Sequence, residues 1–241
     1  MAPIRKGDGT PLEIPGVSEV RAGDGRVFFE GDAIPDEEDL HAHYDFSEYS
    51  GTSNFDDLTG NGYDLTNGSI SSLSANINGR QAGEFDGVDD SVWSSTFSEV
   101  SEPVTFFLVA EVDDSPNDLN VAIQSHSSGD DNIWYDNRSG ENVWKLNAAS
   151  GNIAGGGISD VLITGLYDGS NSILRSNGVQ VDSGSVGYSG LDVLGLGSRE
   201  PASSDRYFDG KIGEVLVYPM DKSGSFDEIE SYLADRWSIN I

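Results

Sequence analysis

The chain has 241 residues, of which 36% are hydrophobic, enough for the core of one β domain. It carries 42 acidic and 13 basic residues, a net charge of −29, and it has no cysteine. The composition excludes disulfides, thiolate metal sites and a cysteine nucleophile, and it disfavours nucleic acid as a partner because phosphate would be repelled. No apolar run is long enough to span a membrane, and the polar segment Met1–Lys6 predicts no signal peptide in the sequence as given.

The charge is dispersed along the chain, and only four of the basic residues are lysine. A surface of this kind resembles that of a halophilic archaeal protein. In molar salt, repulsion between like charges is screened at separations beyond about 3 Å. We therefore expect folding that depends on salt. The alternative is an acidic extracellular protein that binds divalent ions.

Residues 1–38 differ from the rest of the chain. A Gly-Asp-Gly turn occurs at Gly7–Gly9 and again at Gly23–Gly25, each before an extended segment. Val27, Phe28 and Phe29 are too apolar for a disordered linker, so we predict an arm that docks on other subunits. A small β-hairpin on the same domain is the alternative. The main domain is then predicted to cover residues 39–241.

From residue 41 onward, short apolar runs alternate with Gly, Asn, Asp and Ser, a pattern typical of an all-β sandwich. The nearly continuous apolar run Val104–Val112 predicts a central strand. The other predicted strands are His41–Phe46, Gly83–Phe85, Ser91–Trp93, Val121–Ser125, Ile133–Asp136, Val143–Leu146, Val161–Tyr167, Ser172–Ser176, Val179–Asp182, Asp192–Leu196 and Lys211–Tyr218.

Two local signals near the C-terminus are specific. Asn177-Gly178 between two strands predicts a type I′ hairpin. Ser225 and Glu228 have the spacing of a capping box. In this motif each of the two side chains accepts a hydrogen bond from the backbone N–H of the other residue. A helix is expected after Ser225, because Phe226, Ile229, Leu233 and Trp237 then lie on one buried face.

Five motifs occur in the order found in the laminin-G-like, concanavalin A-like jelly rolls, and the chain resembles that family over residues 41–239. The motifs are His43–Phe46 with Asp57–Leu65, Gly83–Asp90, Val161–Gly169, Ser176–Gly178, and Phe208–Tyr218 with Tyr232–Trp237. The resemblance implies an all-β fold: a concanavalin A-like β-sandwich (jelly roll) with one short C-terminal helix, preceded here by the extended arm. It does not by itself imply a function, because this fold hosts lectins, hydrolases and adhesive virion proteins.

The sequence departs from the glycoside hydrolases of this fold. Their Glu-x-Asp-x-x-Glu pattern supplies two carboxylates, whereas Glu111-Val-Asp113 is followed by Pro116 here. No serine elbow or zinc-protease helix is present. We therefore predict that the chain is not an enzyme. His41 and His43 could form a zinc pair on one face of a strand, but a polar face of an edge strand is favoured.

Asp131 and Asn132 resemble the calcium-binding pair of pentraxin-like members of the fold, and Glu200 stands where a later loop adds a carboxylate. The resemblance implies a site for calcium or another divalent cation, although solvated loop acids are the simpler alternative. No cofactor is otherwise required. Trp134 and Tyr135 are candidates for a carbohydrate-binding platform, and Trp93 and Trp237 are predicted to be core residues.

Acid-rich composition, a display fold and an apolar arm together favour a structural or receptor-contacting virion protein, such as a capsid turret, spike or tail appendage, of a virus of halophilic archaea. Its expected location is the virion surface, after assembly in the host cytoplasm. The expected partners are other virion proteins and copies of itself through the arm, with a host surface glycan as a further candidate. The alternative is a secreted or cell-surface carbohydrate-binding module of a halophilic archaeon, and a glycoside hydrolase is the least favoured.

Overall fold

The structure is a computed structural model that describes residues 20–23, 26–29, 34–94, 97–113, 119–199 and 205–241. The chain consists of two compact units, Met1–Glu37 and Glu38–Ile241, each with most of its contacts within itself. Among the described residues, no helix has both the length and the apolar character needed to cross a membrane.

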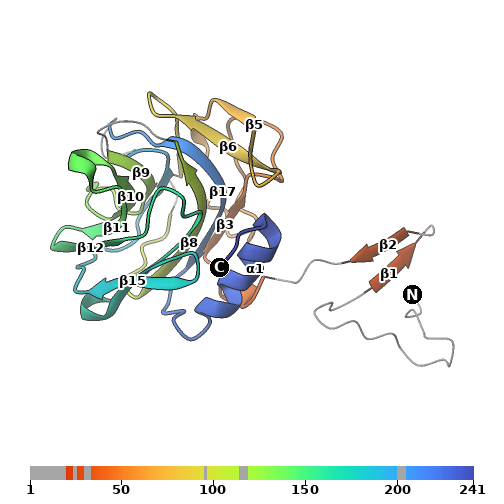
Figure 1. The fold of residues 1–241 in the computed structure, drawn as a ribbon. Helices are drawn as coiled ribbons and strands as arrows, with labels where there is room; N and C mark the ends of the chain where they lie inside the picture. Colours follow the sequence, from red (N-terminus) through yellow and green to blue (C-terminus); the bar gives the residue numbers. More distant parts are fainter. Residues whose placement is uncertain (1–19, 24–25, 30–33, 95–96, 114–118, 200–204) are drawn as a thin grey trace. The chain divides into compact units, whose positions relative to one another are not determined.

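The first unit contains a pair of antiparallel strands, β1 (Val20–Gly23) and β2 (Arg26–Phe29), in which Val20 pairs with Phe29 (Figure 1). The predicted assembly residues Val27, Phe28 and Phe29 lie on β2. Residues 1–19, 24–25 and 30–33 of the predicted arm lie outside the described residues. The domain boundary at residues 38 and 39 and the assembly role of the arm stay predictions.

The second unit is a β-sandwich of two antiparallel sheets (Figure 1). The short η1 (Glu37–Asp39) spans the boundary between the units. The seven-stranded sheet has the order β12-β11-β10-β9-β16-β7-β4. Its strands are β4 (Asn67–Ser69), β7 (Ser91–Ser94), β9 (Leu119–Gln124), β10 (Asn132–Asp136), β11 (Val143–Ala148), β12 (Gly151–Gly155) and β16 (Leu194–Leu196), with η2 (Arg138–Gly140) between β10 and β11.

The eight-stranded sheet has the order β15-β14-β13-β8-β17-β6-β5, and β3 pairs with β17 as well. Its long strand β17 contacts β6 through Asp209–Ile212 and β3 through Glu214–Val217. The strands are β3 (Ala42–Asp45), β5 (Ser72–Ile77), β6 (Arg80–Asp86), β8 (Val104–Val112), β13 (Leu162–Tyr167), β14 (Ser172–Ser176), β15 (Val179–Gly184) and β17 (Asp209–Tyr218), with η3 (Gly169–Asn171) between β13 and β14.

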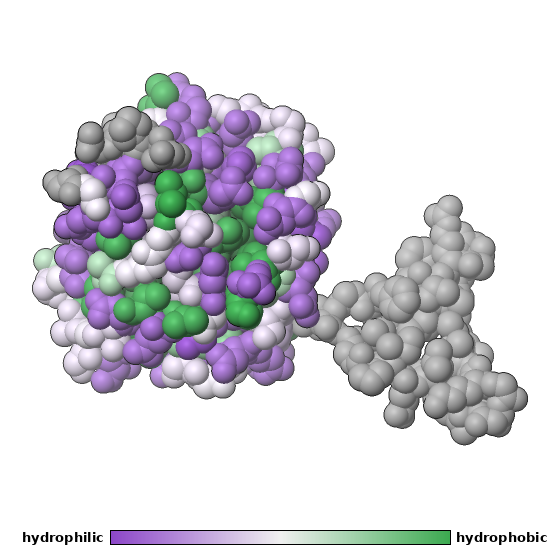
Figure 2. Space-filling view, in the orientation of Figure 1, coloured by the Kyte–Doolittle hydropathy of each residue, from purple (hydrophilic) through white to green (hydrophobic). Residues whose placement is uncertain are grey.

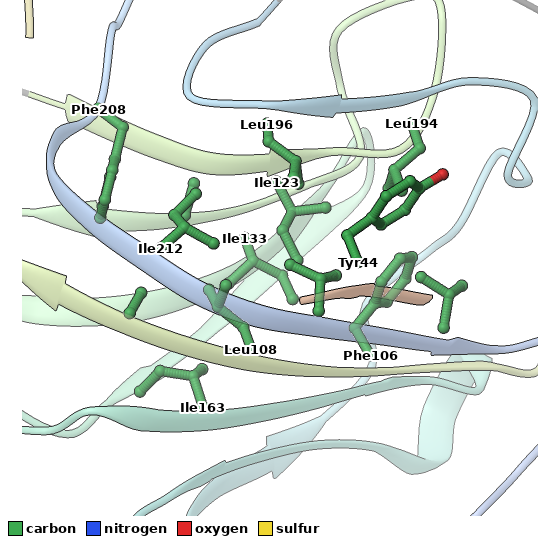
Figure 3. Packing of buried hydrophobic residues seen from close by; sticks show 14 of the residues in the cluster. Tyr44, Phe106, Leu108, Ile123, Ile133, Ile163, Leu194, Leu196, Phe208 and Ile212 are labelled. Atoms are coloured by element: carbon green, nitrogen blue, oxygen red, sulfur yellow. The ribbon is translucent and has the colours of Figure 1, made fainter. Parts of the chain in front are cut away.

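The hydrophobic core lies between the sheets, where alternate side chains of both point inward. Figure 3 shows residues of the seven-stranded sheet beside residues of the eight-stranded sheet: Ile123, Ile133, Leu194 and Leu196 with Phe106, Leu108, Ile163 and Ile212. At Gly165 an added Cβ would lie 2.8 Å from Cδ1 of Leu146, so a larger residue there would force the side chain of Leu146 to shift.

Helix α1 (Phe226–Trp237) packs on the outer face of the eight-stranded sheet. Phe226, Ile229, Leu233 and Trp237 are buried, which confirms the predicted apolar face. The predicted capping box is wrong, because Ser225 makes no capping hydrogen bond through its side chain. The ψ of Ser225 is 8°, outside the extended region in which a cap residue aims its oxygen at the first turn.

The predicted sandwich is confirmed, and β8 and β14 have the predicted bounds. Asn177 and Gly178 have φ angles of 44° and 79°, as a type I′ turn requires. The prediction missed β4, β5 and β12, each of which is an edge strand. An edge strand buries less of its surface, so its sequence carries a weaker alternating pattern.

The visible surface is mainly hydrophilic, with hydrophobic residues in separate patches (Figure 2). The exposed large hydrophobic residues of the described chain come from five separate places in the sequence: Leu58, Val88, Ile158, Val179 and Ile241. Single exposed apolar residues are normal on a folded protein, and the described residues offer no continuous apolar face from this set.

Candidate functional site

A row of polar side chains crosses the outer face of the seven-stranded sheet. Residues that pair across neighbouring strands point to the same side, and in six of the seven strands a residue beside them belongs to the core. The pairing therefore places one residue from every strand in a single row: Asn67, Trp93, Gly195, Gln124, Asn132, Asn147 and Asn152. Five of the seven residues carry a side-chain amide.

The middle of this row is a hydrogen-bonded floor. Gln124 and Asn132 are buried, and the amide nitrogen of Asn132 donates to the carbonyl oxygen of Gly129 at 3.0 Å. Asn147 is partly exposed and donates to the carbonyl oxygen of Asp130 at 2.8 Å. The side-chain oxygen of Asn132 is buried and has no hydrogen-bond partner.

Trp134 lies on the same face of β10, two residues beyond Asn132. It pairs with Val121 and Lys145 on the neighbouring strands and forms a small apolar cluster with Leu119 and Val121. Its ring is 9% exposed, and the Arg206 guanidinium lies 5.4 Å from the ring centroid. The indole Nε1 of Trp134 is buried without a hydrogen-bond partner.

Asn132 and Trp134 thus present an unpaired acceptor and an unpaired donor on one face of one strand. Alternate residues of a strand are about 6.5 Å apart along the backbone, and both atoms are buried. A buried polar atom without a partner costs about 1–3 kcal/mol, a cost that a ligand can remove by supplying the hydrogen bond. A hydroxyl group both donates and accepts, and it matches this pair.

Four of the thirteen basic residues surround this part of the sheet: Arg138, Lys145, Arg199 and Arg206. Arg199 donates from Nε and Nη2 to the carbonyl oxygen of Gly129 at 3.1 and 3.0 Å. Lys145 donates from Nζ to Asp136 at 3.0 Å and to Glu141 at 2.5 Å. Burial alone would raise the pKa of Asp136, but hydrogen bonds from Arg138 and Lys145 lower it to about 2.

The residues predicted to bind a cation are not brought together by the described structure. Asp131 and Asn132 are consecutive, so their side chains lie on opposite sides of the chain. Asp131 accepts from the backbone nitrogen of Ser189 at 2.6 Å, and burial raises the pKa of its carboxyl. Glu200 lies outside the described residues. The calcium or divalent-cation site stays a prediction.

The two rings predicted to form a sugar-binding platform also point to opposite sides of β10. Trp134 is on the outer face, whereas Tyr135 is fully buried in the core beside Trp144. One flat platform is therefore not formed by the pair. The prediction that Trp93 is a core residue is wrong: Trp93 is partly exposed on the outer face, because its neighbour Val92 points into the core. Trp237 is buried as predicted.

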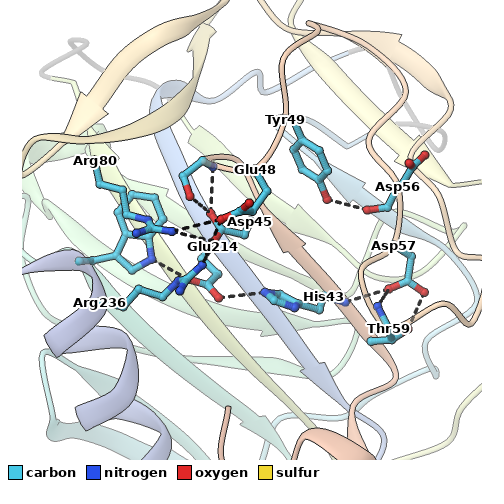
Figure 4. A network of polar contacts seen from close by, with 12 residues as sticks. His43, Asp45, Glu48, Tyr49, Asp56, Asp57, Thr59, Arg80, Glu214 and Arg236 are labelled. Carbon is cyan, nitrogen blue, oxygen red and sulfur yellow. Dashed lines mark hydrogen bonds and ion pairs between the residues drawn. The ribbon is translucent and has the colours of Figure 1, made fainter. Parts of the chain in front are cut away.

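The outer face of the eight-stranded sheet carries a different set of charges (Figure 4). Glu214 is fully buried and accepts hydrogen bonds from His43 Nε2 at 2.9 Å and from Trp237 Nε1 at 2.7 Å. Arg236 contacts Glu214 and also Asp45, and Arg80 donates to Asp45 at 3.1 Å. These contacts join α1 to β3, β6 and β17, which indicates a structural role.

The two histidines of the predicted zinc alternative have different surroundings. His43 contacts Glu214, whereas the ring of His41 lies 4.7 Å from that of Tyr63 and 5.2 Å from that of Phe97. Glu111, the residue nearest to a hydrolase motif, accepts from Nζ of Lys211 at 2.5 Å.

Three aspartates of the Gly83–Asp90 motif lie close together: Asp86, Asp89 and Asp90. Each has a carboxylate oxygen within 4.8 Å of the others. Asp86 accepts from the backbone nitrogens of Val88 and Asp89, and Asp90 accepts from those of Ser71 and Asp86. These bonds shape the turn between β6 and β7.

No protein-family model matches the chain, and no curated protein matches it. Solved structures do match. A Trypanosoma rangeli sialidase in complex with sialic acid is 14% identical, with a TM-score of 0.60, and the match covers 87% of this chain and 35% of that one. The chain thus spans about a third of the length of the sialidase chains that it matches.

Two further structures are similar in fold. Domain 4 of AbnA, a GH43 extracellular arabinanase from Geobacillus stearothermophilus, in complex with arabinotriose, is 17% identical, with a TM-score of 0.55, and 79% of this chain matches 98% of that one. A GH54 α-L-arabinofuranosidase is 13% identical, with a TM-score of 0.59, and the match covers 75% and 50% of the two chains. At these identities the likeness establishes the β-sandwich fold.

These matches contradict the prediction that the chain is not an enzyme. That prediction relied on the absence of a carboxylate pattern, a serine elbow and a zinc-protease helix, whereas the fold also occurs in sialidase and arabinofuranosidase chains. Catalytic activity is therefore open for this chain. The structures named above are carbohydrate-active proteins and give no support to a virion role.

Proposed function

We propose that the second unit binds carbohydrate through the outer face of its seven-stranded sheet. The observation that carries the proposal is the unpaired pair on β10, the side-chain oxygen of Asn132 and the indole nitrogen of Trp134. The likeness to an arabinanase domain in complex with arabinotriose supports the proposal, because nearly all of that domain is covered by the match.

Carbohydrate fits the chemistry of this face better than an apolar ligand does. Sugar hydroxyls both donate and accept hydrogen bonds, so they match an acceptor on Asn132 and a donor on Trp134. The partly exposed amide of Asn147 offers a further acceptor, and the exposed 9% of Trp134 supplies apolar contact for the C–H groups of a sugar ring.

The experiment is calorimetric titration of the full chain with arabino-, xylo-, manno- and sialyl-oligosaccharides. Trp134→Phe removes the unpaired donor and keeps an aromatic ring, so it should weaken binding about tenfold, the value of one hydrogen bond. Trp144→Phe is the matched control: its Nε1 is also buried without a partner, but Trp144 lies in the core on the neighbouring strand. The control should leave the affinity unchanged.

Binding to none of these saccharides, or equal affinities for Trp134→Phe and the unmodified chain, would overturn the proposal. Release of reducing ends, measured in the same mixtures, would identify a hydrolase. The setting in which binding would be used, a virion surface or a secreted or cell-surface module, stays a prediction that neighbouring genes can test.

A further inference from the structure

We infer that the turn between β9 and β10 carries a serine esterase site, with Ser128 as the nucleophile, His126 as the base and Asp192 as the residue that orients the base. The Oγ atom of Ser128 lies 2.7 Å from Nδ1 of His126, and Nε2 of His126 lies 3.7 Å from Oδ2 of Asp192. A serine, a histidine and a carboxylate in this order of contact form the arrangement of a nucleophilic hydrolase. Such an arrangement is recognised by its geometry and not by its order in the sequence.

The hydrogen bonds of His126 determine which of its ring nitrogens can take a proton. The backbone N–H of Ser128 donates to Nδ1 at 3.1 Å, so in the neutral ring Nδ1 is the acceptor and the proton is on Nε2. Nδ1 therefore also accepts from the Ser128 hydroxyl, which is the contact that a general base needs. Nε2 lies at ion-pair distance from Asp192, whose negative charge stabilises the positive ring that forms when Nδ1 takes the proton.

Asp192 is held in place by the same turn. The backbone N–H and the hydroxyl of Ser127 donate to Oδ1 and Oδ2 of Asp192, both at 2.7 Å. The backbone N–H of Asp192 donates to the carbonyl oxygen of Ser125. Ser127 and Asp192 are 65 residues apart in the sequence, so no local spacing predicts that they meet.

Five side chains around the turn hold its backbone in position. They donate to carbonyl oxygens of residues 126–131: Gln124 to His126, Asn132 and Arg199 to Gly129, Asn147 to Asp130, and Ser125 to Asp131. Catalytic groups need support of this kind, because the nucleophile and the base must keep their geometry before a substrate binds. The buried amides of Gln124 and Asn132 thus have a role that requires no ligand to reach them.

An ester can reach the site from solvent. Ser128 is exposed, and the side chains of His126 and Asp192 are 20% and 31% exposed. Oγ of Ser128 bonds to the ester carbonyl carbon while its proton moves to Nδ1 of His126, and the alcohol then leaves with that proton as its C–O bond breaks. Water next gives a proton to Nδ1 and bonds to the acyl carbon. The carboxylic acid is released, and Nδ1 returns the proton to Oγ.

The charges near the turn favour a neutral substrate. Oδ2 of Asp130 lies 3.4 Å from Oγ of Ser128, and the chain carries a net charge of −29, so an anionic acyl group would be repelled. The Asp130 carboxylate also opposes the negative oxygen that develops on the carbonyl during attack. We therefore expect slow turnover of a small neutral ester, such as an acetyl ester.

The test is labelling of the full chain with a fluorophosphonate, mapped by peptide mass spectrometry, together with hydrolysis of p-nitrophenyl acetate. The label should be found on Ser128, and Ser128→Ala should remove both the label and hydrolysis above that of buffer. His126→Gln should slow hydrolysis about 100-fold, as expected for loss of a general base. Ser74→Ala is the matched control and should change neither readout, because Ser74 is also exposed and contacts a side chain two residues earlier, but that residue is Ser72.

Asp130→Asn shows whether His126 or Asp130 takes the proton. It removes the negative charge beside Oγ and should raise the rate, whereas a fall in rate would overturn the assignment of His126 as the base. No label on Ser128 in the unmodified chain, or hydrolysis by Ser128→Ala equal to that of the unmodified chain, would overturn the site. These outcomes are independent of the carbohydrate proposal, which is tested at Trp134.

Discussion

Trp237 and Trp134 occupy comparable positions on the two outer faces of the sandwich, yet their indole nitrogens differ. Both rings are buried, 1% and 9% exposed, and both have an arginine over them, Arg80 at 5.2 Å and Arg206 at 5.4 Å. Nε1 of Trp237 donates to Glu214 at 2.7 Å. Nε1 of Trp134 has no partner.

The comparison shows that residue type and burial do not separate a structural residue from a binding residue. The face under α1 is closed, and the carboxylates of Asp45 and Glu214 are satisfied by side chains of three elements. The face of the seven-stranded sheet keeps a buried donor and acceptor without partners. The paired carboxylates stabilise the fold, although Nε of Arg80 and Nε of Arg236 in the same network are buried without a hydrogen-bond partner.

The largest effect is expected from breaking the paired face at Glu214. Glu214→Gln removes the charge opposite Arg236 and weakens the bond from Trp237, and loss of one partner of a buried ion pair costs about 3–5 kcal/mol. Chemical denaturation should show this loss in the free energy of unfolding. Glu111→Gln, which breaks a more exposed pair with Lys211, is the control. Equal losses for the two variants would contradict a special role of the network.

The next largest effect is the difference in stability loss between substitutions of the two tryptophans. Trp237→Phe leaves the buried carboxylate of Glu214 short of one donor and should cost about 1.5–3 kcal/mol for the hydrogen bond to a charged group, besides the smaller ring. Trp134→Phe removes a donor that has no partner, so its stability loss should be smaller, and saccharide binding should fall instead. The comparison fails if Trp134→Phe is the more destabilising of the two.

A smaller effect is expected from acid. Burial alone would raise the pKa of Asp45, but hydrogen bonds from Arg236 and Ser47 lower it, and the pKa of Asp136 is lowered to about 2. A carboxyl with a lowered pKa stabilises the fold above the unfolded value of about 4 and loses that contribution as the pH falls through the folded value. Unfolding midpoints between pH 6 and pH 2 should therefore decline below about pH 4.

Asp131 should affect the pH dependence of stability differently from Asp45, because burial raises the pKa of the Asp131 carboxyl. Its contribution has the opposite sign, because the fold gains stability as the pH falls through the raised value. Asp131→Asn should therefore raise stability at neutral pH, and this gain should disappear in acid, where Asp131 is itself protonated. Asp45→Asn should destabilise at neutral pH. The same direction for both variants at neutral pH would contradict this assignment.

The smallest effect is expected from Glu111→Gln itself. The side chains of Glu111 and Lys211 are 37% and 21% exposed, and exposed ion pairs contribute about 0–1 kcal/mol. Denaturation at low and high ionic strength should show that even this contribution shrinks with salt. A loss above about 2 kcal/mol would place Glu111 in the same class as Glu214 and remove the contrast between buried and exposed pairs.

The sequence alone determined the sandwich, most strand positions and the C-terminal helix, because the signals are local. Val104–Val112 is apolar throughout and forms a central strand, and Asn177-Gly178 adopts the two positive φ angles that a type I′ turn needs. Phe226, Ile229 and Leu233 repeat at helical spacing and are buried together. Each pattern reports the geometry of one element.

Only the tertiary structure decided which residues meet on a face. Trp134 and Tyr135 are adjacent in sequence, but strand alternation places one outside and the other in the core. The row from Asn67 to Asn152 joins strands from four separate stretches of the chain, so its register follows from strand order and not from any local spacing. A side chain's partner depends on that register, and for this reason no sequence signal separated Trp93 and Trp134 from Trp237.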